Sequence, residues 1–182
     1  EQILPDELFL QASGNEFSNL LMNYSMGHYD YSGKNDIIGQ LIKAITKKYK
    51  CLITYDSKSS QNENKFYIEP EKLLTYNGGL YVIFYVRNQK EFWLLAVHRI
   101  LDMTVYDEVF PDDHPFDEKT FIKNRFGLFS GKPEKIRLKF NKSIRHYIEN
   151  KHWNSTQEFI SDKRGNLILD MEAPITPELT SW

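Results

Sequence analysis

Charge is segregated along this chain of 182 residues, and the segregation limits the possible folds more than any single motif does. Residues 102–118 contain seven acidic and no basic side chains, and Pro111 and Pro115 interrupt regular structure there. The net charge is −5 over residues 1–36 and +5 over residues 132–153. This pattern is typical of two small modules joined by an acidic linker, with an acidic arm in front of them.

Composition excludes several classes of protein. The formal net charge of −2 shows that the chain is not a polycation that coats nucleic acid, so any anion-binding surface must be local. A single cysteine, Cys51, excludes a disulfide framework and a Cys-based zinc site. The longest apolar run, Leu80 to Val86, is far shorter than the roughly 20 residues of a membrane span. We therefore expect a cytoplasmic protein with no metal and no cofactor.

The first module reads as one helix followed by short strands. Apolar residues recur at helical spacing between Ile37 and Tyr49, behind a possible cap at Asn35 or Asp36. Strands are predicted at 51–55, 66–68, 72–76, 80–86 and 92–101. The Asn77-Gly78-Gly79 sequence between two of these runs favours a tight hairpin turn. One helix and several short strands predict a small, strongly bent sheet or barrel.

The second module has a different order of elements. Alternating residues predict a strand at 135–140, a helix follows at 143–150, and two further strands lie at 155–161 and 167–171. Thr176-Pro177-Glu178 is typical of a helix N-terminus, with Thr as the cap and Pro at the first helical position. This order is that of a ferredoxin-like domain without its last strand.

No sequence motif for an enzyme is present: the chain lacks a phosphate loop, a dinucleotide glycine motif, His-Glu-x-x-His and Gly-x-Ser-x-Gly. We expect Cys51 to be a partly buried, inert thiol and Asp112-Asp113-His114 to lie in a solvated linker. Aromatic rings, hydroxyls and cations do gather on neighbouring predicted strands of the first module, a combination that suits a nucleotide or single-strand site. The alternative is that these tyrosines only pack on a half-buried sheet. The residues are Tyr55, Ser57, Tyr67, Lys72, Tyr81, Tyr85, Trp93, His98 and Arg99.

Several of these segments resemble the WYL domain, which is named for a Trp-Tyr-Leu triplet that stands here as Leu80-Tyr81-Val82. The resemblance also rests on Ile45 to Tyr55, on Pro70-x-x-Leu73 and on His98-Arg99-Ile100. The continuation is similar to the C-terminal extension of WYL proteins in its basic strand at 135–140, its 153–157 stretch and its turn at Gly165. Together the similar segments cover about residues 36–182.

The resemblance implies an α+β fold in which a helix precedes a small Sm-like, SH3-type β-barrel and an incomplete ferredoxin-like domain follows. We accordingly divide the chain into an acidic arm (1–35), the WYL barrel (36–110), an acidic linker with a short helix (111–131) and the extension (132–182). Family members are bacterial transcriptional regulators, often dimeric, that carry an N-terminal winged helix-turn-helix. That region is absent here, and because the chain begins with Glu1, without Met, and stops at Trp182 just after a helix start signal, we interpret it as a piece of something longer.

By motif position, the resemblance implies a site for a nucleotide or single-stranded nucleic acid. Tyr55 and Ser57 match a Tyr-x-Ser at a strand end, and Tyr81 matches the tyrosine of the triplet. His98 and Trp93 depart from the family, since His98 replaces an aspartate and Trp93 stands where an arginine is common. The predicted ligand-binding set is Tyr55, Ser57, Lys72, Tyr81, Trp93, His98 and Arg99. A second anion surface is predicted at Arg137, Lys139, Lys142 and Arg145, and a plainly solvated face explains that surface equally well.

The sequence thus predicts a non-enzymatic, ligand-sensing module of a bacterial transcriptional regulator. The module would bind its effector on the barrel and act on double-stranded DNA through the missing domain. We expect it to be a homodimer. The main alternative is a stand-alone module that binds single-stranded nucleic acid. The two differ in whether a helix-turn-helix precedes Glu1. Only an enzyme would turn over a substrate without a partner.

Overall fold

The first helix and strand form where the sequence predicts them. The computed structural model describes residues 27–57 and 64–181, so most of the acidic arm lies outside the described residues. A short 3-10 turn, η1 (Ser32–Lys34), leads into α3 (Asn35–Lys47), which has no side-chain cap at its N-terminus. The predicted cap at Asn35 or Asp36 is therefore wrong. Lys48 ends the helix in the left-handed conformation, at φ 53°, and turns the chain into β1 (Tyr49–Tyr55).

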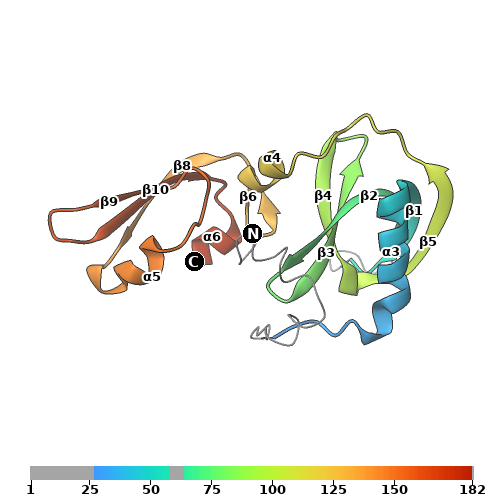
Figure 1. Ribbon diagram of the computed structural model, residues 1–182, viewed down its shortest axis with the longest axis horizontal. Coiled ribbons are helices and arrows are strands. Elements are labelled where there is room, and N and C mark those ends of the chain that lie inside the picture. Colours follow the sequence, from blue (N-terminus) through green and yellow to red (C-terminus); the bar gives the residue numbers. More distant parts are fainter. Residues whose placement is uncertain (1–26, 58–63, 182) are drawn as a thin grey trace, which may run out of the picture.

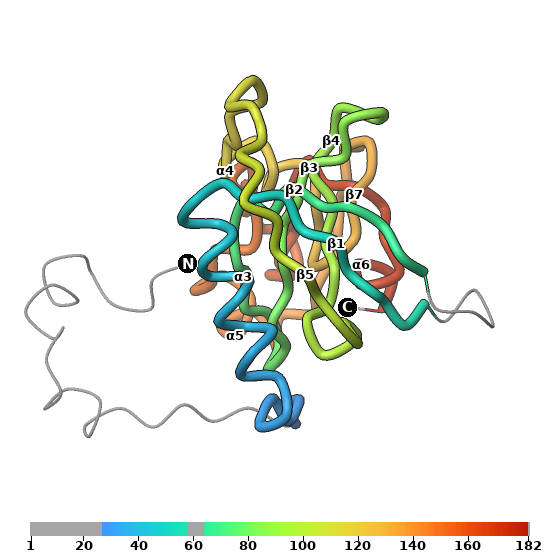
Figure 2. Tube along the Cα trace, turned by 90° about the vertical axis from the view of Figure 1, so that its right-hand side faces the viewer, coloured from blue at the N-terminus to red at the C-terminus, as the bar shows by residue number. Residues whose placement is uncertain are grey.

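Five antiparallel strands form the sheet of the first module, in the order β4-β3-β2-β1-β5. They are β1, β2 (Asn64–Tyr76), β3 (Gly79–Val86), β4 (Glu91–Ala96) and β5 (Ile100–Val109), with the short turn η2 (Val97–Arg99) before the last. Asn77 and Gly78 take φ values of 45° and 72°, which confirms the tight turn expected between β2 and β3. Figure 2 shows α3 lying across β1 and β5.

One long strand, β2, replaces the two short ones that the sequence predicts. Its first part pairs with β1 and its second part with β3, and the register shifts between Pro70 and Lys72. Proline has no backbone N–H for a ladder, so a shift of register at this point is expected. The strand thereby belongs to both halves of the sheet and sets the bend between them.

The sheet does not close. Among the described residues β4 and β5 are the two edges and do not pair with each other, so the closed barrel implied by the family resemblance is not found. The structure is a mixed α/β arrangement with antiparallel sheets. The core lies between α3 and the sheet, where Leu41 and Ala44 of the helix meet Ile53, Val82 and Ile100, all fully buried.

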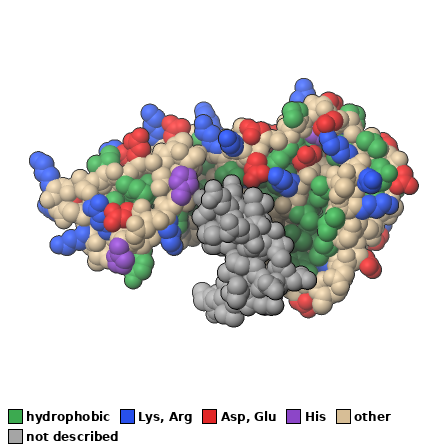
Figure 3. All heavy atoms as spheres, viewed as in Figure 1, with side chains coloured by type: hydrophobic (Ala, Val, Ile, Leu, Met, Phe, Trp, Pro, Cys, Tyr) green, Lys and Arg blue, Asp and Glu red, His purple; other side chains and the backbone are tan. Residues whose placement is uncertain are grey.

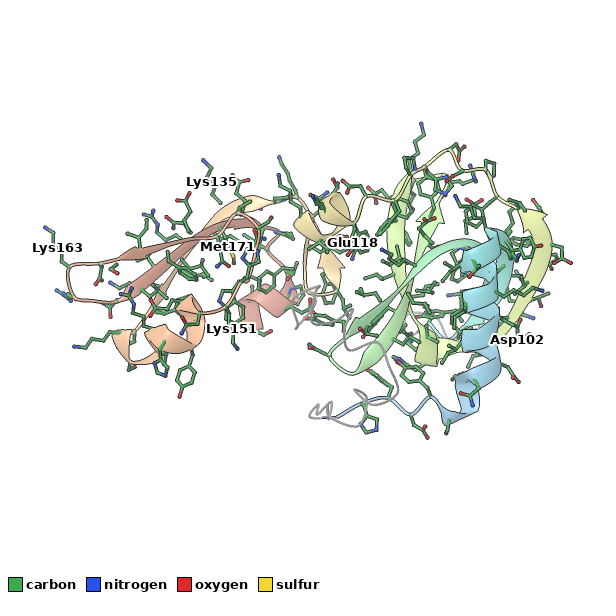
Figure 4. All side chains as sticks on the ribbon, viewed as in Figure 1. Asp102, Glu118, Lys135, Lys151, Lys163 and Met171 are labelled. Atoms are coloured by element: carbon green, nitrogen blue, oxygen red, sulfur yellow. The ribbon has the colours of Figure 1, made fainter. Side chains whose placement is uncertain are left out.

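The strand β5 occupies the first half of the acidic 102–118 segment. Residues 100–109 pair with β1, although Asp102, Asp107 and Glu108 carry charge. Met103 is buried and Val105 packs against the core, whereas the acidic side chains remain exposed. Figure 4 labels Asp102 at the outer side of this module. The connector between the modules therefore starts only after Val109.

The second module follows the predicted order of elements. Its three-stranded sheet has the order β8-β10-β9, formed by β8 (Glu134–Phe140), β9 (Glu158–Ser161) and β10 (Leu167–Ala173). The helical segments are η3 (Lys142–Ile144), α5 (Arg145–Glu149) and α6 (Pro177–Ser181). Thr176 caps α6 as predicted, since its hydroxyl accepts a hydrogen bond from the Leu179 N–H at 3.1 Å. Leu169, Met171 and Ala173 form the buried centre.

Between the two modules the chain forms α4 (Glu118–Lys123) and a hairpin of β6 (Arg125–Phe126) and β7 (Phe129–Ser130) (Figure 1). The guanidinium of Arg125 donates to the carbonyl oxygen of Phe92 on β4, at 3.3 Å, and to that of Leu128, at 2.6 Å. It also lies 4.2 Å from the centre of the Phe121 ring, and burial lowers its pKa. Arg125 thus ties the connector hairpin to the first module. Within the described ranges, no helix is long and apolar enough to cross a membrane.

Candidate ligand-binding site

Tyr55, Tyr81 and Arg99 come together at one end of the first sheet. The Tyr55 hydroxyl accepts a hydrogen bond from the Ala96 N–H at 3.3 Å, and Ala96 is the β4 partner of Tyr81. The guanidinium carbon of Arg99 lies 4.9 Å from the centre of the Tyr55 ring, a cation–π distance. Burial raises the pKa of both tyrosines, so both phenols stay protonated near neutral pH. We call these three residues the Arg99 cluster.

Two hydrogen-bond donors of the Arg99 guanidinium have no acceptor among the described residues. Its Nε and Nη2 atoms are buried and make no hydrogen bond to any of the described residues. A buried donor without an acceptor costs about 1–3 kcal/mol, and more for a charged group. An anion that accepted hydrogen bonds from these two atoms would remove that cost and would gain charge-assisted bonds.

His98 is held by a tyrosine from the N-terminal arm. The Tyr29 and His98 rings stack with centroids 3.8 Å apart and an interplanar angle of 10°. Tyr31, close by in the chain, accepts a hydrogen bond from the Leu80 N–H at 2.6 Å. Sequence reasoning missed both tyrosines because nothing local in the acidic arm indicates where it lies. Their position puts the end of that arm beside the Arg99 cluster.

Lys72 does not join the cluster. Its ammonium nitrogen forms an ion pair with Glu118 of α4 at 2.6 Å and lies 5.7 Å from the centre of the Phe116 ring. Figure 4 labels Glu118 at the start of the connector helix. Lys72 therefore links the first module to the connector instead of lying beside Arg99.

Ser57 and Trp93 line a separate pocket of about 810 Å³, which Tyr55 also lines. The pocket lies beside residues 64–68 of β2, which pair with β1, before β2 begins to pair with β3 at Glu69. We call it the aromatic pocket because seven of the seventeen residues that line it carry aromatic rings. The ring residues are Tyr55, Phe66, Tyr67, Phe84, Tyr85, Trp93 and Tyr106. Its volume falls within the range of about 300–1,000 Å³ that is usual for small-molecule sites.

The charges in the wall of the aromatic pocket are paired. The Lys50 ammonium lies 2.6 Å from the Glu108 carboxylate, and the Nε atom of Arg87 donates to Glu69 at 2.6 Å. Glu69 is only 5% exposed, and no motif in the sequence had marked it as a site residue. Hydrogen bonds to Glu69 and Asp113 raise the pKa of Arg87, so its charge is fixed.

His114 of the connector packs against the outside of this wall. Its ring stacks on Tyr85 with centroids 3.8 Å apart and an interplanar angle of 7°, and its Nδ1 atom lies 2.6 Å from Asp113. Hydrogen bonds from His114 and Arg87 hold the pKa of Asp113 below its usual value. The His114 side chain is 6% exposed. The expectation of a solvated Asp112-Asp113-His114 loop is therefore wrong for His114, which is docked on the first module.

Cys51 is fully buried, more deeply than the sequence predicts, and burial raises the pKa of its thiol to about 12. The thiolate form, which is the reactive species, is then absent at neutral pH. Among the described residues, no group of three or more His, Cys, Asp or Glu side chains could hold a metal ion.

The predicted second anion surface consists mostly of neutralised cations. Arg137 binds Asp170 through two hydrogen bonds at 2.7 and 2.6 Å, Lys139 lies 2.7 Å from Asp162, and Arg145 lies 2.7 Å from Glu149. These partners reduce the positive charge that an anion would meet. Figure 3 shows basic and acidic side chains interspersed over this module.

The first module is thus a small antiparallel sheet backed by one helix, with an aromatic and cationic cluster at one end. Residues 36–105 match the family described as the WYL domain, and this part of the chain is a WYL domain. The region 106–182 lies outside that match.

Comparison with curated proteins gives no match. Among solved structures, the chain is similar to proteasome accessory factor B/C (PafBC) of Arthrobacter aurescens, with 11% sequence identity and a TM-score of 0.40. That match covers 81% of this chain and 22% of the other, so the chain spans about a fifth of that protein's length.

Proposed function

We propose that this chain is a ligand-sensing regulatory module of a bacterial transcriptional regulator and acts by binding, not by catalysis. The effector is a nucleotide or a short single-stranded nucleic acid, held at the Arg99 cluster. The WYL domain at residues 36–105 supports the regulatory role. The observation that carries the ligand class is the pair of buried Arg99 nitrogens that no described residue accepts from.

The Arg99 cluster suits the chemistry of a nucleotide. The Arg99 fork can bind two phosphate oxygens at once, which lysine cannot do. Tyr81, which is only partly buried, adds a hydroxyl group and an aromatic face on which a base or sugar can pack, and the buried Tyr55 ring supports the guanidinium. Stacking of His98 on Tyr29 extends the aromatic surface toward the N-terminal arm. The effector would act on DNA binding by favouring one arrangement of the modules, because it binds the two states unequally.

The wider assembly belongs to the same proposal. A winged helix-turn-helix outside this chain would contact double-stranded DNA, and two copies would form a homodimer. We also propose that the first module follows an Sm-like path without closing. The elements β8, α5, β9, β10 and α6 follow the ferredoxin-like pattern up to its last strand, which supports an incomplete ferredoxin-like domain.

The test is a titration of short single-stranded DNA and of mononucleotides against the wild-type chain and Arg99→Ala. We expect the substitution to weaken binding at least ten-fold, since a charge-assisted hydrogen bond contributes about 1.5–3 kcal/mol. Arg99→Lys, which keeps the charge but not the fork, should recover only part of the affinity. Arg164→Ala in the exposed β9–β10 turn is the matched control. Equal affinity of Arg99→Ala and Arg164→Ala, with both folded by circular dichroism, would refute the site.

Salt dependence separates the sensor from a stand-alone single-strand binder. A site that holds one or two phosphates loses affinity gently as salt rises, whereas a groove that neutralises many phosphates loses it steeply. The paired cations of the second module leave few free charges for such a groove. We therefore expect a shallow slope of log affinity against log salt.

A further inference from the structure

We propose that the aromatic pocket is a second binding site, which takes a planar, uncharged heteroaromatic ligand of the size of a nucleobase or nucleoside. The inference goes beyond the Arg99 cluster and stands without it. The pocket is bounded by β1, β2, β3, β4 and β5, and the Arg99 side chain is not part of its lining.

The wall of the pocket offers rings that are free to stack. Tyr67, Trp93 and Tyr106 are 60%, 43% and 37% exposed, so part of each side chain faces solvent. The Tyr67 and Tyr106 rings lie 5.8 Å apart between centroids, and their hydrogen bond raises the pKa of Tyr106. Trp93 lines the pocket from β4. Planar ligands gain most from such surfaces, because every heteroaromatic base has a π-face.

The charges in the wall argue against a phosphate group. Both cations that line the pocket, Lys50 and Arg87, already hold carboxylates at 2.6 Å. Arg87 has a second carboxylate, that of Asp113, at 3.2 Å. A phosphate would have to displace one of these partners and would then lie beside the released carboxylate. An uncharged ligand avoids that repulsion, which distinguishes this pocket from the Arg99 cluster.

Polar groups at the rim can orient such a ligand. Ser57, Asn64 and Asn88 line the pocket beside the rings. Amide and hydroxyl groups both donate and accept hydrogen bonds, so they match the mixed edge of a nucleobase. A few polar groups in a mostly apolar pocket are typical of small-molecule sites.

The test uses adenosine and guanosine as probes, titrated calorimetrically into the full chain. Tyr67→Ala removes one stacking wall from an exposed position and should not disturb the core. We expect it to weaken nucleoside binding at least five-fold, the factor that corresponds to about 1 kcal/mol of base stacking. Tyr67→Phe keeps the ring and should bind within two-fold of wild type. Tyr147→Ala, at a tyrosine 64% exposed on α5, is the matched control and should not change binding.

Two further outcomes decide between this pocket and its alternatives. Arg99→Ala should leave nucleoside affinity at the aromatic pocket unchanged, even where it abolishes nucleotide binding at the Arg99 cluster. Loss of binding at one site is therefore distinguishable from loss at the other. If Arg99→Ala weakens adenosine as much as Tyr67→Ala does, the nucleoside binds at the Arg99 cluster and the inference is wrong. Absence of binding by either nucleoside to the folded wild-type chain at millimolar concentration, or equal affinity of Tyr67→Ala and Tyr147→Ala, also overturns it.

Discussion

Replacing His114 by alanine should destabilise the first module, although His114 lies in the connector. The imidazole is 6% exposed and stacks on Tyr85, with Phe92 and Phe110 each 6.0 Å away between ring centroids. Truncation of a large buried side chain to alanine costs about 2–5 kcal/mol, and the cost is smallest where the site can collapse. The connector can relax into the space that the ring leaves, so we expect the free energy of unfolding to fall by about 2 kcal/mol. Part of this is the ring pair itself, which contributes about 0.5–1.5 kcal/mol.

The assay is thermal unfolding of the full chain, followed module by module. Trp93 reports the first module and Trp153 the second, so variants that keep only one of the three tryptophans, Trp93 or Trp153, give separate fluorescence transitions. A module of 60–100 residues shifts by about 4–8 °C per kcal/mol, so the Trp93 transition should fall by about 10 °C. The Trp153 transition should stay in place.

Two companion variants test whether the His114 ring stabilises the first module. His114→Phe keeps the ring stack on Tyr85 but loses the contact with Asp113, and it should recover more than half of the lost stability. His152→Ala, at an exposed histidine of the second module, should leave the Trp93 transition unchanged. A shift below about 2 °C for His114→Ala, equal to that of His152→Ala, would show that the connector is not docked.

Three further outcomes follow from the packing. Gly127→Ala should lower stability by more than about 1 kcal/mol in a denaturant titration, because Gly127 has φ +67° and an added Cβ would lie 1.8 Å from the Glu178 carboxylate. The second module should lose stability as pH falls below the ordinary aspartate pKa of 3.8, because Lys139 holds the pKa of Asp162 below that value in the folded state. A carboxylate with a lowered folded pKa stabilises above its unfolded pKa and loses that contribution on acidification, so Asp162→Asn should flatten the acid limb of a pH series of melting temperatures. Cys51 should react with iodoacetamide at pH 8 only as fast as the chain unfolds, because its thiol is fully buried with a pKa of about 12; rapid labelling of the native chain would contradict this.

Local patterns predicted most of the elements because helices and hairpins are specified by neighbouring residues. The apolar spacing before Tyr49 gave α3, and Asn77-Gly78 gave the turn between β2 and β3. The strand β5 escaped prediction because its exposed face carries the acidic residues. Their charge obscured the alternation of Met103 and Val105 on the buried face.

The site was predicted only in part because its contacts join distant segments. Tyr55, Tyr81 and Arg99 meet as the family motif implies. Lys72 instead pairs with Glu118, which is 46 positions away in the chain and belongs to an element whose position no local pattern gives. Glu69 and His114 were missed for the same reason, since the burial of a charged residue depends on what packs over it.

The hydrogen bonds of Arg125 limit which substitutions can weaken the contact between the connector hairpin and the first module. Both oxygens that accept its hydrogen bonds are backbone carbonyls, one from Phe92 and one from Leu128. Every amino acid supplies the same carbonyl, so exchange of either of those side chains leaves the acceptors in place. Replacing Arg125 removes both bonds at once. The hydrogen bond that joins the connector hairpin to the first module at Phe92 therefore depends on the residue at position 125 and not on the side chain at position 92.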